Sequence, residues 1–364
     1  IGVRLVGSEM CIRDRAWRIK TALPSSTTPS LTNMATDERP RAFGDSWKFE
    51  PRDKLGYYQR ALLDRGVLFP SSREADLPRP KGKVPAYPLW RQHLWLFPRV
   101  LALVLGRYVF MKLTGWTVHP VVMYAVVVLY NMTVYRAFYR LLHSLVRRHG
   151  YLDGEMERDS ATPGMAKRVV TEFRQAMLIR PLMVLALSYD RTALPSIGWW
   201  LPVQLCIFTM LVDFFYYWVH RLTHESDMLW SLHRRHHTTK HPTAYLLAFA
   251  DEPQELFDLL GSPVLAYMLF PLSFDTLYIW SVYFGTIEIM GHAGLRMYYP
   301  TALTGPFMRP IHCEGVVEDH DLHHRFGWRD SCNYGKQCMF WDAMFGTMGK
   351  RLETYDANVD WSMN

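Results

Sequence analysis

The sequence lacks the patterns of several common protein classes. Its five cysteines show no CxxC spacing and are too scattered to suggest a zinc ribbon or a disulfide framework. The HExxH signature of zinc proteases is absent, as is the HPGG motif of a fused haem domain. No Glu-x-x-His pair of the kind found in soluble di-iron proteins stands out. Alternating strand patterns and repeats of fixed period are also missing, so we expect one mostly helical unit.

Charge and composition favour a membrane over nucleic acid as the environment of this chain. Hydrophobic residues make up 49% of the sequence and aromatic residues 14%, and the net charge is +7. The basic residues flank apolar segments and form no recognised nucleic-acid motif, so we expect no nucleic-acid partner. The mean hydropathy of -0.08 averages long apolar segments with strongly charged ends.

Six apolar segments predict an all-α integral membrane bundle. Most of them approach the roughly 20 residues that cross a bilayer as a helix. Several contain a charged residue, so we expect the helices to pack around a polar interior. The segments pair into about three hairpins, with tight connections at 112–117, 190–198 and 274–276. The segments cover residues 94–111, 118–135, 177–189, 201–219, 256–273 and 277–290, and the charges within them are Arg99, Arg107, Asp213, Asp258 and Glu288.

The distribution of arginine predicts the orientation of the bundle. The ends of the hairpins opposite the tight connections share one side, which carries most of the basic residues, including Arg136, Arg140, Arg234 and Arg235. By the positive-inside rule this side is cytosolic, and we expect it to hold a helical cap.

The organisation along the chain suggests five regions. Residues 1–15 resemble translated adapter sequence, so we interpret 1–33 as a non-native or disordered leader, with Met34 a plausible start. Residues 34–90 carry no signal-peptide pattern and form a cytosolic lead-in. We expect the membrane hairpins and their cytosolic connection in 91–198, the catalytic domain in 199–350 and a tail in 351–364.

The spacing of the histidines is the most informative feature of the chain. Of the 15 histidines, 11 lie between His220 and His324. Because residues i, i+3 and i+4 lie on one face of a helix, the imidazoles of each cluster can reach a common ion. The clusters are HxxxH at His220 and His224, HxxHH at His233, His236 and His237, and HxxHH at His320, His323 and His324, with His292 standing alone.

Topology and chemistry both favour a metal centre. The segments 256–273 and 277–290 make two crossings, which returns His292 to the side of the other clusters. Neutral imidazole binds iron, zinc and copper, and this many nitrogens exceed what one ion holds, so two ions are indicated. Nearby carboxylates are either partners for the free N–H of a ligating ring or ordinary solvated charges. These carboxylates are Asp213, Glu318, Asp319 and Asp321.

The order of these motifs resembles the fatty acid hydroxylase and sterol desaturase superfamily over about residues 201–347. The segments LWSLHRRHH, Gly291-His292-Ala-Gly294, Asn333-Tyr334-Gly335 and Trp341-Asp342 strengthen the resemblance. It implies a multi-pass endoplasmic reticulum enzyme whose two iron ions use O2 to hydroxylate or desaturate a lipid such as a sterol, sphingoid base or fatty acyl chain. Electrons would come from cytochrome b5 or a similar external carrier. The basic face is either a docking surface for an acidic carrier or a face that contacts solvent or lipid headgroups.

The resemblance also assigns the ligands. They are His220, His224, His233, His236, His237, His292, His320, His323 and His324. His241 lies four residues after His237 but outside the shared motif, so we expect it to support a ligand and not to bind the metal. Where many members have a His-Pro pair ahead of a Glu, this chain reads ADEPQE at 250–255, which suggests a less characterised branch. Two alternatives stay open, namely a membrane metal-binding or transport protein and a zinc-dependent membrane hydrolase.

Overall fold

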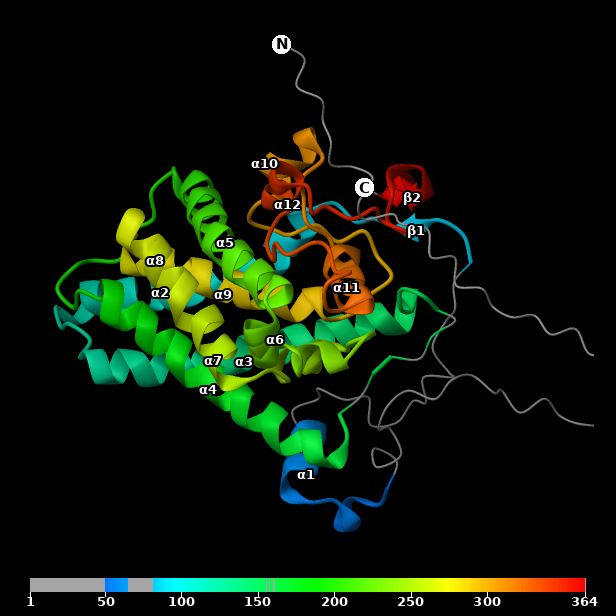
Figure 1. Ribbon diagram of the computed structural model, residues 1–364. Coiled ribbons are helices and arrows are strands. Elements are labelled where there is room, and N and C mark those ends of the chain that lie inside the picture. Colours follow the sequence, from blue (N-terminus) through cyan, green and yellow to red (C-terminus); the bar gives the residue numbers. More distant parts are fainter. Residues whose placement is uncertain (1–49, 65–80, 155, 157, 160, 364) are drawn as a thin grey trace, which may run out of the picture.

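The computed structural model describes residues 50–64, 81–154, 156, 158–159 and 161–363 (Figure 1). The expected leader at 1–33 lies outside these residues, and the expected lead-in at 34–90 lies partly outside them. The longer helices are α1 Tyr57–Asp64, α2 Trp90–Thr114, α3 Pro120–His149, α4 Pro163–Ser188, α5 Leu201–Glu225, α6 Asp227–His233, α8 Ser262–Leu269, α9 Phe274–Gly291 and α11 Val317–Phe326.

Short elements complete the architecture. The short α-helices are α7 Glu252–Leu256, α10 Gly305–Met308 and α12 Phe340–Phe345, and a π-helical turn covers Phe257–Gly261. The 3-10 turns are Arg52–Lys54, His236–Thr238, Ala244–Ala248, Arg309–Ile311, Asp356–Asn358 and Trp361–Met363. The strands β1 Val84–Pro85 and β2 Val359–Asp360 pair in parallel, with Val84 opposite Val359. The expected mostly helical fold is confirmed.

Three helices in the described residues are long and apolar enough to cross a membrane, namely α2, α3 and α5. The other three apolar segments differ from the expectation of further spans. The segment 177–189 is the second half of α4, whose first half is charged. The segment 256–273 lies mostly in a continuous helical run over 252–269, in which a π-helical turn joins α7 to α8, and this run is not among the candidate spans.

The last apolar segment forms α9, which is the central helix of the bundle. Its residues from Phe274 to Met290 are all buried, and it packs against α2, α3, α4, α5 and α11. A helix that is apolar on all sides is enclosed by protein, and large rings such as Trp280 and Tyr278 fill the space around it. The segments 177–189 and 201–219, which were predicted to pair as a hairpin, lie in α4 and α5. Helix α4 packs on α3 and α9, among others, and α5 packs on α6, α8 and α9.

Charged residues within the bundle pair with one another, as expected for a polar interior. The Arg107 guanidinium lies 3.5 Å from the Asp275 carboxylate. The Glu288 carboxylate lies 2.6 Å from the Arg180 guanidinium and 3.1 Å from the Lys336 ammonium. Arg99 differs, because it is on the exposed face of α2. Buried ions need such partners because transfer from water into protein is costly.

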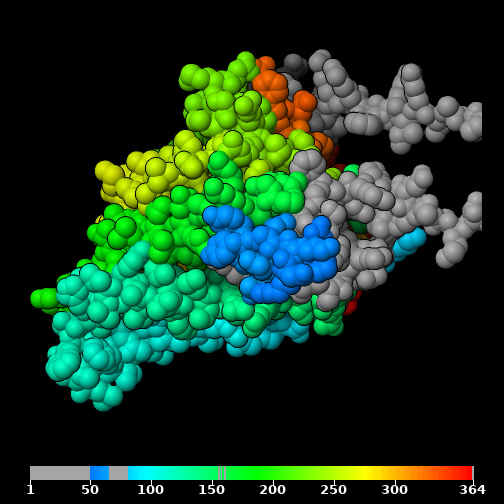
Figure 2. All heavy atoms as spheres, turned by 90° about the horizontal axis from the view of Figure 1, so that it is seen from below, coloured from blue at the N-terminus to red at the C-terminus, as the bar shows by residue number. Residues whose placement is uncertain are grey.

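The remaining elements cover one face and one end of the bundle. Helix α1 lies on the face formed by α3 and α4 (Figure 2), where the Arg136 guanidinium donates to the Asp64 carbonyl at 3.0 Å. At the C-terminal end of α5, helices α6 and α11 and the loops around them form a cap (Figure 1). The candidate site lies beneath this cap.

Candidate metal centre

The nine predicted ligand histidines converge beneath the cap, and all nine are buried. Helix α5 contributes His220 and His224, and α6 and the following 3-10 turn contribute the second cluster. His292 caps the C-terminus of α9, and α11 contributes the third cluster. His292 therefore lies with the other clusters, as predicted, although the two segments whose crossings led to this prediction are not among the three candidate spans.

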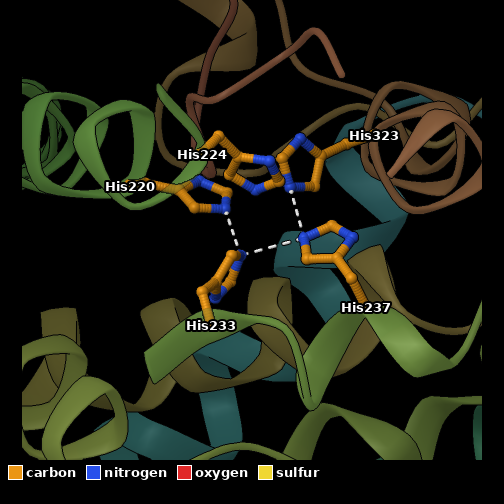
Figure 3. Close-up of side chains that lie close together, drawn as sticks. All are labelled: His220, His224, His233, His237 and His323. Atoms are coloured by element: carbon orange, nitrogen blue, oxygen red, sulfur yellow. Dashed lines mark hydrogen bonds between the residues drawn. The ribbon is translucent and has the colours of Figure 1, made fainter. Parts of the chain in front are cut away.

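The nine side chains form two groups. In each group the ligand nitrogens all lie within 4.8 Å of one another. The five-histidine group comprises His220, His224, His233, His237 and His323, and the four-histidine group comprises His236, His292, His320 and His324. In the first group, Figure 3 shows the His233 Nε2 facing the Nε2 atoms of His220 and His237, at 3.0 and 2.9 Å.

Each HxxHH motif is divided between the two groups. The i, i+4 pair His233 and His237 enters the five-histidine group, whereas His236 enters the other. The third cluster is divided in the opposite sense, with His320 and His324 in the four-histidine group and His323 in the five-histidine group. The expectation of one shared helical face is wrong for the second cluster, because α6 ends at His233 and a 3-10 turn carries the remaining histidines. Both motifs consequently hold the groups side by side.

Hydrogen bonds at Nδ1 orient the rings. Seven of the nine Nδ1 atoms lie against an oxygen acceptor, so each must carry the ring proton and donate it. Nε2 then keeps its lone pair for a metal ion. The acceptors are the carbonyls of Tyr334 for His220 (2.8 Å), Trp328 for His224 (2.9 Å), Phe249 for His236 (3.3 Å), Glu288 for His292 (2.9 Å), Cys332 for His323 (2.7 Å) and Thr239 for His324 (3.0 Å), and the Gln254 side-chain oxygen for His233.

This arrangement fits metal ions. Facing Nε2 atoms, such as those of His292 and His236 at 3.2 Å and of His320 and His292 at 3.0 Å, direct lone pairs at one another when Nδ1 carries the proton. The buried Nε2 atoms of His224 and His324 have no hydrogen-bond partner in the described part of the chain. A cation between the rings would remove the repulsion and satisfy these atoms, and imidazole nitrogens suit transition metals.

Burial keeps the rings neutral, as a ligand must be. It lowers the pKa of His236 to about 3, with a smaller contribution from the Lys336 charge. Burial, reinforced by neighbouring histidines, also holds the pKa of His237 and His323 well below the usual value of 6.5. At neutral pH each of these rings therefore carries a single proton and keeps a lone pair on its other nitrogen for a metal ion.

The four predicted carboxylate partners support the cap instead of the imidazoles. The interpretation that they accept a ring N–H is wrong, since carbonyl oxygens occupy that position. The Glu318 carboxylate accepts the amide of Leu352 at 2.8 Å and of Thr354 at 2.6 Å, and Asp319 pairs with Arg351 at 2.8 Å. The other two are Asp321, which bonds Arg158 and Arg325, and Asp213, which accepts the amides of Lys336, Gln337 and Cys338.

His241, the predicted supporting histidine, belongs to neither group. It is half-buried, and its backbone amide donates to the Asp159 carboxylate at 2.8 Å. The i+4 spacing from His237 carries no information here because the chain leaves helical geometry at Thr238.

Several residues that shape the site were not identified as such from the sequence. Gln254 orients His233, although its only signal was its place in the atypical stretch 250–255. The Asp342 carboxylate accepts the amides of Tyr334 and Gly335, both at 2.7 Å, which fixes the loop whose Tyr334 carbonyl binds His220. A side chain at Gly335 would lie 2.5 Å from the Cys338 carbonyl oxygen, so glycine is required at this position.

The four-histidine group adjoins two cavities. One of about 70 Å³ is lined by His236 and His292, by apolar side chains and by a set of buried charges that includes Lys336 and Glu288. A smaller one of about 20 Å³ contacts His320 together with Ile287 and Met290. The second ion would therefore lie beside space that small molecules can occupy.

Comparison with known proteins gives a family match and several similar proteins. The model of the family described as fatty acid hydroxylase matches residues 205–347. Fatty acid hydroxylase vlmA of Lecanicillium sp is 38% identical over 231 residues, which cover 60% of this chain and 63% of the relative. Methylsterol monooxygenase 2-2 of Arabidopsis thaliana is 25% identical, covering 59% of this chain and 82% of the relative. Very-long-chain aldehyde decarbonylase GL1-8 of Oryza sativa subsp. indica is 28% identical, covering 53% and 72%.

The chain thus spans less than two thirds of the length of the Lecanicillium relative. No solved structure matches it.

Proposed function

Since this chain is a member of the fatty acid hydroxylase and sterol desaturase superfamily, we propose that it uses molecular oxygen to hydroxylate or desaturate a lipid. The observation that carries the proposal is the pair of histidine groups, nine buried imidazoles whose ligand nitrogens gather in two adjacent sets. Its relatives are named as hydroxylases, monooxygenases and decarbonylases, which supports an oxidoreductase.

The residues present fit two iron ions, one in each group. Bound there, iron would supply the one-electron chemistry and oxygen activation that attack on an unactivated C–H bond requires. In hydroxylation, one atom of O2 enters the C–H bond, and the other leaves as water after an external donor has supplied two electrons and the solvent two protons. Desaturation needs the same two external electrons and two protons, but the substrate loses two hydrogens and both oxygen atoms leave as water.

The protein itself supplies orientation and a dry environment. The carbonyls of Tyr334 and Cys332 hold the proton of His220 and His323 on Nδ1, so Nε2 stays available throughout a reaction cycle. Because every ring is buried, bulk water has little access to the centre. The four-histidine group has the adjoining cavities, so we place oxygen and the reacting carbon there.

A larger cavity supports an apolar substrate. It measures about 240 Å³ and lies between α2, α3 and α9, where Trp95, Phe138 and Tyr283 line it. Ile287 and Met290 line both this cavity and the small one beside His320. A hydrocarbon chain in the larger cavity would therefore point toward the four-histidine group. The substrate classes that we propose are sterols, sphingoid bases and fatty acyl chains.

We further propose a multi-pass location in the endoplasmic reticulum membrane, with the metal centre on the cytosolic side. Helices α2, α3 and α5 supply possible spans, and the basic residues around the cap obey the positive-inside rule for this orientation. Cytochrome b5 or a similar carrier would then reach the centre from the cytosol.

Metal analysis is the first test. The full chain, purified in detergent, should contain close to two iron ions per molecule and should consume oxygen when reduced. The matched control is His241→Ala, which removes a histidine outside both groups and should keep its iron. Zinc in place of iron without oxygen consumption would indicate a hydrolase, and readily exchanged metal without oxygen consumption would indicate a transport or storage protein.

Lipid profiling tests the activity. The chain is expressed in yeast strains that each lack one sterol, sphingolipid or fatty-acid hydroxylase, and their lipids are compared by mass spectrometry. We expect one lipid class to gain an oxygen or lose two hydrogens with the native chain and with His241→Ala, but not with His236→Ala. An equal change with His236→Ala would contradict the assignment of the centre.

A further inference from the structure

We propose that a small one-electron carrier with an acidic face docks over Trp328, and that Trp328 and Trp230 conduct its electrons to the five-histidine group. This inference rests on the proposed function, because it assumes that redox-active ions occupy the histidine groups. It adds the place where the donor binds and the route that its electrons take.

A stacked pair of indoles connects the surface with the centre. Trp328 is 40% exposed, and its ring is stacked on Trp230 with 5.8 Å between centroids and 20° between planes. The Trp230 ring in turn lies 5.2 Å from the His224 ring and 5.6 Å from the His237 ring. Two aromatic side chains thus bridge the distance from solvent to two histidines of the same group.

A second route starts at the same residue. The Nδ1–H of His224 donates to the backbone carbonyl of Trp328 at 2.9 Å. An electron that reaches Trp328 therefore has only that residue's own covalent bonds and one hydrogen bond to cross before it enters the His224 ring. Both routes end at the five-histidine group.

The two histidine groups consequently face different surroundings. His236, His292 and His320 of the four-histidine group line cavities in which oxygen and substrate can lie. His224 and His237 of the five-histidine group lie under the indole pair. Such a division would let a carrier deliver electrons without blocking the path of the substrate.

The surface around Trp328 has the chemistry of a transient docking site. Two exposed apolar side chains lie two residues from these indoles in the chain, Phe326 (52%) before Trp328 and Met228 (76%) before Trp230. The Arg329 guanidinium lies over the Trp328 ring, 4.8 Å from its centroid, and the Lys240 ammonium lies directly against Gly327. Arg234, four residues after Trp230 in the chain, is also exposed. Redox encounters use small contact areas with complementary charge, for which a few cations around an aromatic centre suffice.

Acidic residues in the same region limit the choice of partner. Asp227 pairs with Arg329 at 2.6 Å, and Glu225 and Asp330 are exposed. Because Arg329 already has an anionic neighbour, exposed Lys240, which lies against Gly327, is the cation through which we expect an acidic carrier to be recognised. The electron balance is simple: the carrier is oxidised by one electron, a ferric ion in the five-histidine group becomes ferrous, and two encounters complete one turnover.

Anaerobic stopped-flow spectroscopy tests the route without knowledge of the substrate. The oxidised, iron-loaded chain is mixed with the reduced soluble haem domain of cytochrome b5, and oxidation of the haem is followed. Trp328→Leu should slow haem oxidation several-fold at saturating carrier, and Trp328→Phe should restore most of the rate. Lys240→Glu should lower the second-order rate constant about ten-fold at low salt, with a smaller effect at high salt.

The controls separate electron transfer from folding and from the metal centre itself. Trp199→Leu removes an indole that is 78% exposed in the connection before α5, and should change nothing. Dithionite, a small reductant that needs no docking, should reduce the native chain and Trp328→Leu at equal rates.

Normal haem oxidation in Trp328→Leu, or equal slowing with both reductants, would overturn this inference and leave the proposed function intact. A chain that binds no iron would instead refute the proposed function.

Discussion

Replacement of Gln254 by leucine should weaken metal binding to the five-histidine group while leaving every ligand in place. Gln254 is buried, and its side-chain oxygen accepts the Nδ1–H of His233. Six other rings donate to backbone carbonyls, which no substitution removes. Gln254 is therefore the position at which ring orientation can be changed most directly by mutation.

The structure sets the size of the effect. Without an acceptor, the His233 ring can rotate and take the other tautomer, which withdraws one of five ligands from the centre. Loss of such a partner typically costs 10–100-fold in metal affinity, or about 1.4–2.8 kcal/mol. In the metal-free protein the unsatisfied ring N–H should cost about 1–3 kcal/mol of stability.

Competition with a chelator of known affinity measures this effect, with bound iron determined by mass spectrometry. Gln254→Glu should bind iron at least as well as the native chain, because a carboxylate accepts the ring proton more strongly. Gln92→Leu is the matched control, since Gln92 donates to the Pro300 carbonyl at 3.0 Å and lies on α2. If Gln254→Leu and Gln92→Leu retain iron equally at every chelator concentration, the assigned orientation of His233 is incorrect.

Three further predictions concern the two groups and the cap. His236 and His237 are neighbours in the chain but belong to different groups. In metal analysis, His236→Ala should lose metal mainly from the four-histidine group, His237→Ala mainly from the five-histidine group, and the double variant from both. The Glu318 carboxylate accepts four hydrogen bonds, and in Glu318→Gln two of these donors would face an amide N–H. We therefore expect Glu318→Gln to lower the free energy of unfolding by about 3 kcal/mol in denaturant titrations. Glu225→Gln, at an exposed position, should have little effect. In metal-free protein the pKa of His236 is lower in the folded state than the value of 6.5 in the unfolded state. Below pH 6.5 the unfolded state therefore binds a proton that the folded state does not. The free energy of unfolding should fall by about 1.4 kcal/mol per pH unit as the pH decreases from 6.5 toward 3. A melting temperature that is constant between pH 6.5 and 5 would contradict that last expectation.

The convergence of the histidines was predictable because its signal is local and chemically specific. HxxxH on α5 and HxxHH on α11 place imidazoles on helical faces whatever the rest of the chain does. The position of His292 beside the other clusters was also predicted, but from two crossings that are not among the three candidate spans. The partners at Nδ1 could not be predicted, because most are backbone carbonyls, which every residue has.

The membrane prediction agrees in kind, and three of the six predicted segments lie in helices that are long and apolar enough to span a membrane. Hydropathy detects apolar segments, but it does not distinguish a helix that faces lipid from α9, which faces protein on all sides. The same ambiguity affected the carboxylates, whose proximity in sequence to the ligands suggested imidazole partners. In the folded chain, Glu318 reaches the segment at 352–354 instead.

The sequence by itself determined the helical class, the ligand chemistry and the presence of enough imidazoles for two ions, since each follows from residue type and short-range spacing. Only the tertiary structure decided how each HxxHH motif is divided between two centres, which group adjoins the cavities and which lies beneath Trp230. These features depend on contacts between residues far apart in the chain, such as His236 with His292, which local spacing does not encode.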